Sequence, residues 1–203
     1  LNLIYFGTGN PQPVINGRKR QGDNLYTESI VALNPDTGRL AWYFQASPHD
    51  THDWDATQTP VLFDGTFNGQ PRKLLAQAAR NGWFFVLDRE TGRSLSSTEY
   101  VKTNWALGVD AKGQPVPNPE KHPQIAGALV TPNQGGATNW PPPTFSPQTG
   151  LFYVNATRAF SVYYIYDPGD NPQGWGGTDR GGWGEAMTQA IDYKTGKVKW
   201  THK

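Results

Sequence analysis

The sequence predicts an all-β protein, and three observations support this prediction. Glycine (23 residues) and proline (17 residues) are abundant in the 203-residue chain, and so are aromatic residues, with 8 Trp, 9 Tyr and 9 Phe. Turn-forming and aromatic residues in such amounts are typical of many short strands. A pattern of strand, Thr-Gly turn and strand recurs along the chain, and no stretch has the apolar periodicity of a convincing helix.

The recurring pattern has four copies. In residues 29–44, alternating apolar residues lead into an Asp-Thr-Gly turn and then into a second strand. Residues 83–97 repeat this form, residues 143–155 are a looser copy, and residues 187–200 match the first copy most closely. The glycine of each Thr-Gly pair suits the positive φ of a tight hairpin turn. We therefore expect four β-hairpins.

The spacing of these hairpins predicts a β-propeller with four-stranded antiparallel blades. The Thr-Gly pairs begin at positions 37, 91, 149 and 195, so they recur at intervals of 54, 58 and 46 residues. A β-sandwich with similar turns is the alternative. Against it, the first and last copies share the spacing AxxxxTGxxxW, ending on Trp42 and Trp200, which suits packing between blades. We expect residues 1–203 to be a partial propeller domain of about four blade units, truncated at both ends.

Three polar, Gly- and Pro-rich segments separate the hairpins, at residues 11–27, 103–143 and 166–184. We predict them to be loops that gather on one face and build the functional site. The net charge of +1, without long runs of either sign, argues against nucleic acid as a partner. The chain has no cysteine, no signal peptide and no apolar run near the ~20 residues that span a bilayer, so we expect no thiolate metal site and no transmembrane segment.

The segment PHDTHDWDATQTP, residues 48–60, is the most informative part of the chain for function. It holds three aspartates and two histidines within thirteen residues. Carboxylates this close repel one another unless a cation or shared protons relieve the repulsion. The segment therefore indicates either cation binding or proton abstraction. The histidines do not form a convincing zinc site, because no further ligand is evident.

Five motifs in consistent order resemble the pyrroloquinoline-quinone (PQQ)-dependent alcohol dehydrogenases, which include the methanol and ethanol dehydrogenases of the bacterial periplasm. The motifs are GTGNP at 7–11, HDxxDxD at 49–55, RNG at 80–82, NW at 139–140 and AxDxxTGKxxW at 190–200. The resemblance implies part of an eight-bladed propeller whose blades interlock through tryptophan-bearing repeats. It also implies a periplasmic location and PQQ with a bound metal ion as cofactors.

The resemblance assigns the acidic segment to catalysis and metal binding. Aligned without gaps, Asp53 falls on the general base that takes the hydroxyl proton of the alcohol, and we predict Asp53 as the base; a shifted alignment would make Asp55 the base instead. In an extended segment Asp53 and Asp55 point the same way, so we expect them to converge on one metal ion. An aspartate at position 55 resembles the mark of the lanthanide-using branch, but related glucose dehydrogenases share it. Both calcium and a lanthanide therefore stay open.

The remaining motifs contribute the other expected site residues. Asn10 resembles the family's amide ligand of the metal, and we predict that role for it; an Asx turn before proline is the alternative. Arg80 is placed where a guanidinium stabilises charge on the reduced quinone. Asn139 and Trp140 are placed beside the quinone, with simple packing as the alternative. A further glutamate ligand of the family comes from an earlier blade that this chain does not contain.

These assignments predict an oxidoreductase that oxidises a small alcohol to an aldehyde by hydride transfer to metal-bound PQQ. Electrons then pass to a cytochrome c-type acceptor, because the chain has no CxxCH haem motif of its own. The alternatives are a PQQ-dependent glucose or polyol dehydrogenase, against which GTGNP argues, and a non-catalytic propeller scaffold, against which HDxxDxD argues. We expect the 203-residue chain alone to be inactive.

Overall fold

The computed structural model describes residues 1–166 and 174–203, which form antiparallel sheets joined by long loops. The first sheet has the order β1-β2-β3 and the second the order β4-β5-β6-β7. Their strands are β1 (Ile4–Gly7), β2 (Ser29–Leu33), β3 (Leu40–Gln45), β4 (Val61–Phe67), β5 (Gln70–Ala78), β6 (Trp83–Asp88) and β7 (Ser94–Glu99). Each strand pairs with the next along the chain, as the recurring hairpins predict.

The third sheet is built on two long strands and has the order β10-β12-β13-β14, with β11 also paired to β12. Its strands are β10 (Ala128–Val130), β11 (Thr144–Ser146), β12 (Leu151–Ile165), β13 (Gly177–Asp192) and β14 (Val198–His202). A separate hairpin and two single-turn 3-10 helices complete the fold. They are β8 (Ala106–Val109), β9 (Pro115–Pro117), η1 (Gly17–Lys19) and η2 (Pro119–Lys121).

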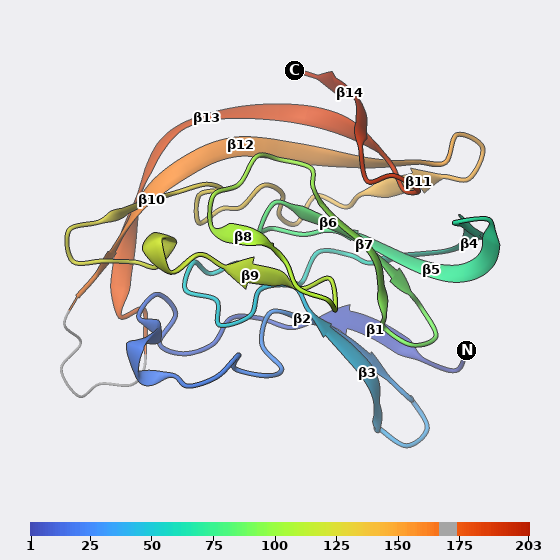
Figure 1. The fold of residues 1–203 in the computed structure, drawn as a ribbon, viewed down its shortest axis with the longest axis horizontal. Coiled ribbons are helices and arrows are strands. Elements are labelled where there is room, and N and C mark those ends of the chain that lie inside the picture. Colours follow the sequence, from blue (N-terminus) through green and yellow to red (C-terminus); the bar gives the residue numbers. More distant parts are fainter. Residues whose placement is uncertain (167–173) are drawn as a thin grey trace.

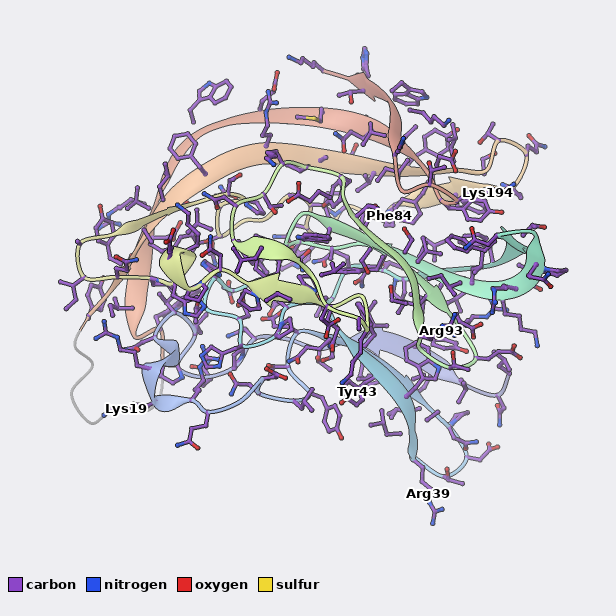
Figure 2. The ribbon with its side chains drawn as sticks, in the orientation of Figure 1. Lys19, Arg39, Tyr43, Phe84, Arg93 and Lys194 are labelled. Carbon is purple, nitrogen blue, oxygen red and sulfur yellow. The ribbon has the colours of Figure 1, made fainter. Side chains whose placement is uncertain are left out.

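The second sheet lies between the first sheet and the β12–β13 hairpin (Figure 1). Neighbouring residues of a strand face opposite sides of its sheet, and two phenylalanines of β6 use both sides. Phe85 packs against Phe44 of the first sheet, with ring centroids 5.0 Å apart. Phe84 packs against Phe152 of the third sheet at the same separation, 5.0 Å, and lies between these sheets in Figure 2. The strand WFFVLD therefore contributes side chains to the apolar packing on both faces of the second sheet.

The four predicted Thr-Gly hairpin turns are confirmed. Their glycines, Gly38, Gly92, Gly150 and Gly196, all have φ between 67° and 73°. The predicted loop 166–184 is wrong from Gly177 onwards, because that part is strand β13 paired with β12; residues 167–173 lie outside the described part. The glycines and polar residues of this stretch suggest a loop, yet β12 supplies the backbone hydrogen bonds that make it a strand.

The predicted loop 103–143 likewise contains short strands, β8, β9 and β10. The all-β prediction is confirmed, since the only helices in the described residues are η1 and η2. The number of blade units stays a prediction, because the sheets have three, four, five and two strands. No helix in the described ranges is long and apolar enough to cross a membrane.

Trp42 joins the first two sheets. Its indole Nε1 donates a hydrogen bond to the carbonyl oxygen of Arg89, at 3.1 Å, and its ring lies over the turn glycine Gly92. The matching Trp200 is 44% exposed and packs on Tyr153 of its own sheet, with ring centroids 5.9 Å apart. Trp42 thus contacts the turn between β6 and β7, while tryptophan docking between blades stays a prediction.

Replacing Gly92 with alanine is expected to destabilise the fold more than the same change at Gly38. Both glycines have positive φ, so each alanine costs about 1–2 kcal/mol of backbone strain. A Cβ at Gly92 would also lie 2.6 Å from the Trp42 ring, whereas a Cβ at Gly38 meets nothing within 4 Å. We expect a further loss of about 1–3 kcal/mol at Gly92, measured by chemical denaturation. Equal losses would contradict the tight Trp42 contact.

Candidate functional site

The acidic segment lies in the loop between β3 and β4, and Asp50 shapes it. The buried Oδ2 of Asp50 accepts hydrogen bonds from the backbone N–H groups of His52 (3.1 Å), Asp53 (2.7 Å) and Trp54 (3.3 Å). Burial by itself raises the pKa of Asp50, but the hydrogen bonds and charge of His52 outweigh it and hold the pKa below the ordinary value. Asp50 is therefore an ionised brace that fixes the turn presenting the next residues.

Aromatic stacking and hydrogen bonds of His52 and Trp54 also hold this turn in place. The His52 ring stacks on Trp54, with centroids 4.3 Å apart, and its Nε2 lies 3.1 Å from the carbonyl oxygen of Lys121. The indole of Trp54, itself fully buried, donates to the carbonyl oxygen of Asn133 at 2.9 Å. These contacts tie the acidic loop to the two other loops that approach it, around residues 121 and 133.

Arg80 lies between Asp53 and Asp55 and pairs with both. Its Nη2 is 3.3 Å from Asp53 Oδ2, and its Nη1 is 3.1 Å from Asp55 Oδ2. The predicted convergence of the two carboxylates is therefore present, although for a different reason. Asp53 has φ of 70°, so the segment is not extended; the left-handed turn braced by Asp50 brings both side chains to one guanidinium.

The two carboxylates differ in their surroundings. The Asp53 side chain is 11% exposed and accepts a hydrogen bond from Gln134 Nε2. Burial raises its pKa to about 6, although Arg80 works in the opposite direction, and the neighbouring charge of Asp55 adds to the rise. The Asp55 side chain is 25% exposed, and its Oδ1 accepts the backbone N–H of Asn10 at 2.8 Å. Asp55 is thus the more accessible member of the pair.

The glycines of the GTGNP motif allow two backbones to approach closely. A Cβ at Gly7 would lie 1.7 Å from the carbonyl oxygen of Ala56, and one at Gly9 would lie 3.2 Å from Asp55 Oδ1. The N–H of Ala56 donates to the carbonyl oxygen of Thr8 at 3.1 Å. Glycine is required at Gly7, whereas a side chain at Gly9 would need only a small shift of Asp55. The close approach at Gly7 brings Asn10 beside Asp55.

A third loop, residues 133–140, covers Arg80. The carbonyl oxygen of Gln134 accepts from Arg80 Nε at 3.1 Å and Nη2 at 2.7 Å. A Cβ at Gly136 would lie 2.1 Å from Arg80 Cγ, so only glycine fits. Asn139 donates to the carbonyl oxygen of Gly135 within its own loop, and Trp140 is 85% exposed. The structure thus brings Asn10, Asp53, Asp55 and Arg80 together, and places Asn139 and Trp140 on the covering loop.

Asn139 has features that fit a bound group nearby. The Oδ1 atom of Asn139 is buried and has no hydrogen-bond partner among the described residues. Asn139 also belongs to the lining of a cavity of about 410 Å³ between the covering loop and β12–β13. Sequence reasoning missed Gln134, which contacts both Asp53 and Arg80. The one feature of the sequence that could have indicated Gln134 is its position in the glycine-rich stretch before Asn139. The residue type itself gives no indication, because glutamines in loops are common.

The oxygens at the site suit a hard cation. Asn10, Asp53 and Asp55 offer carboxylate and amide oxygens, which calcium and its analogues prefer, yet such ions take about 6–8 oxygen ligands. No group of three or more histidine, cysteine, aspartate or glutamate residues in the described part of the chain is arranged to hold a metal ion. The residues present therefore fit part of a metal shell, with Arg80 engaging one oxygen of each carboxylate.

Comparisons with known proteins give a consistent result. Residues 1–126 match the family model described as PQQ glucose/ethanol/alcohol dehydrogenase, beta-propeller domain. The chain is 43% identical over 158 residues to the quinohemoprotein alcohol dehydrogenase of Comamonas testosteroni, covering 77% of this chain and 22% of that protein. The crystal structure of the same relative has a TM-score of 0.92 at 33% identity, covering 99% of this chain and 33% of that one.

Two further proteins extend the comparison. The 1-butanol dehydrogenase (cytochrome c) of Thauera butanivorans is 45% identical over 142 residues, which cover 68% of this chain and 20% of that protein. A europium-containing methanol dehydrogenase has a TM-score of 0.79 at 29% identity, covering 100% of this chain and 44% of that one. The chain thus spans 20–22% of the length of the two curated relatives described here.

Proposed function

Since the chain belongs to the PQQ-dependent glucose/ethanol/alcohol dehydrogenase family of β-propeller domains, we propose that it is part of an enzyme that oxidises an alcohol to an aldehyde. The observation that carries the proposal is the buried Arg80 paired with both Asp53 and Asp55, beside Asn10. A fixed guanidinium and a proton-accepting carboxylate are the two protein groups that this oxidation needs. A non-catalytic scaffold has no use for such a buried ionic set.

The chemistry divides between the cofactors and the residues of this chain. When bound, the quinone supplies the acceptor for the hydride of the alcohol, and the metal ion supplies a positive charge beside it. Within this chain, a carboxylate takes the hydroxyl proton, so that the alcohol loses a hydride and a proton and becomes the aldehyde. Arg80 holds the carboxylates in place and offers positive charge where negative charge develops. Asn139 and Trp140 are proposed quinone contacts.

The proton acceptor is a member of the Asp53–Asp55 pair. Asp53 is the base of the gapless alignment, and its pKa of about 6 suits a base at neutral pH. Asp55 is the base of the shifted alignment; it is the more exposed carboxylate and accepts a hydrogen bond from Asn10, the proposed metal ligand. The gapless alignment and the raised pKa favour Asp53, so we propose Asp53 as the acceptor and retain Asp55 as the rival.

The remaining assignments follow from the family. We propose that residues 1–203 are a partial, tryptophan-docked eight-bladed propeller domain with about four blade units. The Trp42 contact supports docking, and we propose that Trp200, which is 44% exposed, makes the same contact with a further blade. Asn10, Asp53 and Asp55 would hold calcium or a lanthanide, with further ligands supplied elsewhere in the polypeptide. A cytochrome c-type acceptor and a periplasmic location complete the proposal; the relative named for cytochrome c supports the former.

Reconstitution tests this proposal directly. A full-length polypeptide carrying this chain is expected to reduce an artificial dye with simple alcohols only when PQQ and either calcium or a light lanthanide are both supplied. The matched controls omit the quinone or the metal in turn, and glucose replaces the alcohol in a parallel assay. Alcohol oxidation without added or bound quinone would contradict the proposal, and a clear preference for glucose would favour the glucose dehydrogenase alternative. The 203-residue chain alone is expected to be inactive.

A further inference from the structure

Glu28 is a buried carboxyl group that the proposed chemistry does not yet use. The residue is fully buried, and neither Oε1 nor Oε2 has a hydrogen-bond partner among the described residues. Its backbone is nevertheless well fixed: its N–H donates to the carbonyl oxygen of Gly9 at 3.1 Å, and its carbonyl oxygen accepts from Ala46 at 2.8 Å. Glu28 therefore lies between the loop that carries Asn10 and the loop that carries the acidic segment, with φ of 51°.

Other buried polar atoms around Glu28 also lack protein partners. They belong to the side chains of Arg20 (Nε) and Gln45 (Oε1), whereas Asp50 Oδ1 lies 3.6 Å from His52 Nδ1. Hydrogen bonds fix both side chains: Arg20 Nη2 donates to the Asp50 carbonyl oxygen at 2.7 Å, and Gln45 Nε2 donates at 3.0 Å to the carbonyl oxygen of Thr27, the residue before Glu28. Buried polar groups left without protein partners are normally satisfied by ordered water. We expect a small hydrated chamber here.

Burial, together with the neighbouring carboxylates, favours the neutral form of the Glu28 carboxyl group. Burial raises its pKa well above the ordinary value, and the carboxylates of Asp50, Asp55 and Asp53 raise it further, while Arg80 opposes them. Arg20 is the other cation coupled to this group. A protonated carboxyl group can donate a proton from one oxygen while it accepts a proton on the other.

We propose that Glu28 relays protons through this hydrated chamber, and that it passes towards solvent the proton that the Asp53–Asp55 pair takes from the alcohol. The inference rests on the proposed function. A proton arrives through ordered water on one Glu28 oxygen as the proton on the other oxygen leaves, so the carboxyl group is unchanged after each transfer. No electrons move in this step. The exposed turn at residues 21–23, next to Arg20, offers the route to bulk water.

The test uses a full-length polypeptide carrying this chain and loaded with quinone and metal. Glu28→Gln keeps the size of the side chain but cannot relay a proton, and Glu28→Asp restores a carboxyl group. Glu120→Gln, at an exposed position, is the control. In the infrared spectrum, the carbonyl band of a protonated carboxylic acid that shifts in D₂O is expected to disappear in Glu28→Gln alone. The same variant is expected to lower kcat about tenfold or more with little change in KM, and Glu28→Asp to recover most of the loss.

The outcomes separate this inference from the proposed function. Loss of the band together with a kcat defect and a larger solvent deuterium isotope effect supports the relay. An unchanged band, or a Glu28→Gln variant with normal kcat and isotope effect, overturns it while leaving the proposed function intact. If the unaltered polypeptide has no alcohol dehydrogenase activity, the proposed function and the relay built on it both fail, whatever the infrared band shows.

Discussion

Asp53→Asn is expected to lower kcat for alcohol oxidation by about 10³-fold, because an amide keeps the shape of the side chain but cannot take a proton. Asp55→Asn is expected to lower kcat by only about tenfold, since its amide oxygen can still accept from Asn10 while the acceptor remains. The measurement is steady-state dye reduction by a full-length polypeptide loaded with quinone and metal. Asp64→Asn, in an exposed surface ion pair with Arg89, is the control and is expected to be near normal.

The comparison of the two variants decides between the two alignments of the acidic segment. A larger loss in Asp55→Asn than in Asp53→Asn would show that Asp55 is the base, as the shifted alignment predicts. Metal affinity measured on the same variants separates proton transfer from ligation. If the replaced aspartate is both the base and a metal ligand, the variant loses both kcat and metal affinity. If it only holds Arg80, the metal affinity of the variant is unchanged. Normal activity in both variants would contradict any catalytic use of the pair.

Local turn chemistry made much of the fold predictable from the sequence. Each Thr-Gly turn has the positive φ that glycine allows, and the strands that flank it carry their own alternation of apolar residues. The stretch after Gly177 was not predictable in this way. Its glycines and charged residues have low strand propensity, and it is a strand because β12 pairs with it over almost its whole length. Pairing with a distant partner outweighs local preference there.

The candidate site residues that lie in recognisable sequence motifs could be predicted from the sequence. Asp53 and Asp55 both pair with Arg80, and the backbone of Asn10 contacts Asp55; the roles that the resemblance implies for these residues stay predictions. Glu28 was not predictable, since a single glutamate before an apolar strand ordinarily indicates a solvated surface. Only its complete burial, between two loops distant in sequence, distinguishes it. The same reasoning applies to Gln134, whose two contacts depend on how a glycine-rich loop folds over Arg80.

Arg80→Met is expected to destabilise the folded state by about 3–5 kcal/mol, because it leaves Asp53 and Asp55 buried together without their shared cation. The guanidinium bridges both carboxylates, which the single ammonium of Arg80→Lys cannot match, so we expect an intermediate loss for lysine. Arg72→Met is the matched control: Arg72 pairs with Asp88 at 3.0 Å but is one-third exposed, and its removal is expected to cost about 1 kcal/mol or less. Chemical denaturation at pH 8 measures these losses.

The pH dependence of this loss identifies its origin. The folded-state pKa of Asp53 is raised to about 6, so the stability that its protonation contributes is present below the unfolded pKa of about 4 and is lost as pH rises through 6. Arg80 lowers this pKa, so its removal raises the pKa further and extends the loss to higher pH. The stability difference between Arg80→Met and the unaltered protein should therefore be smallest near pH 4 and grow towards pH 8. A difference that does not change with pH would mean that Arg80 stabilises the site by packing rather than by neutralising the two carboxylates.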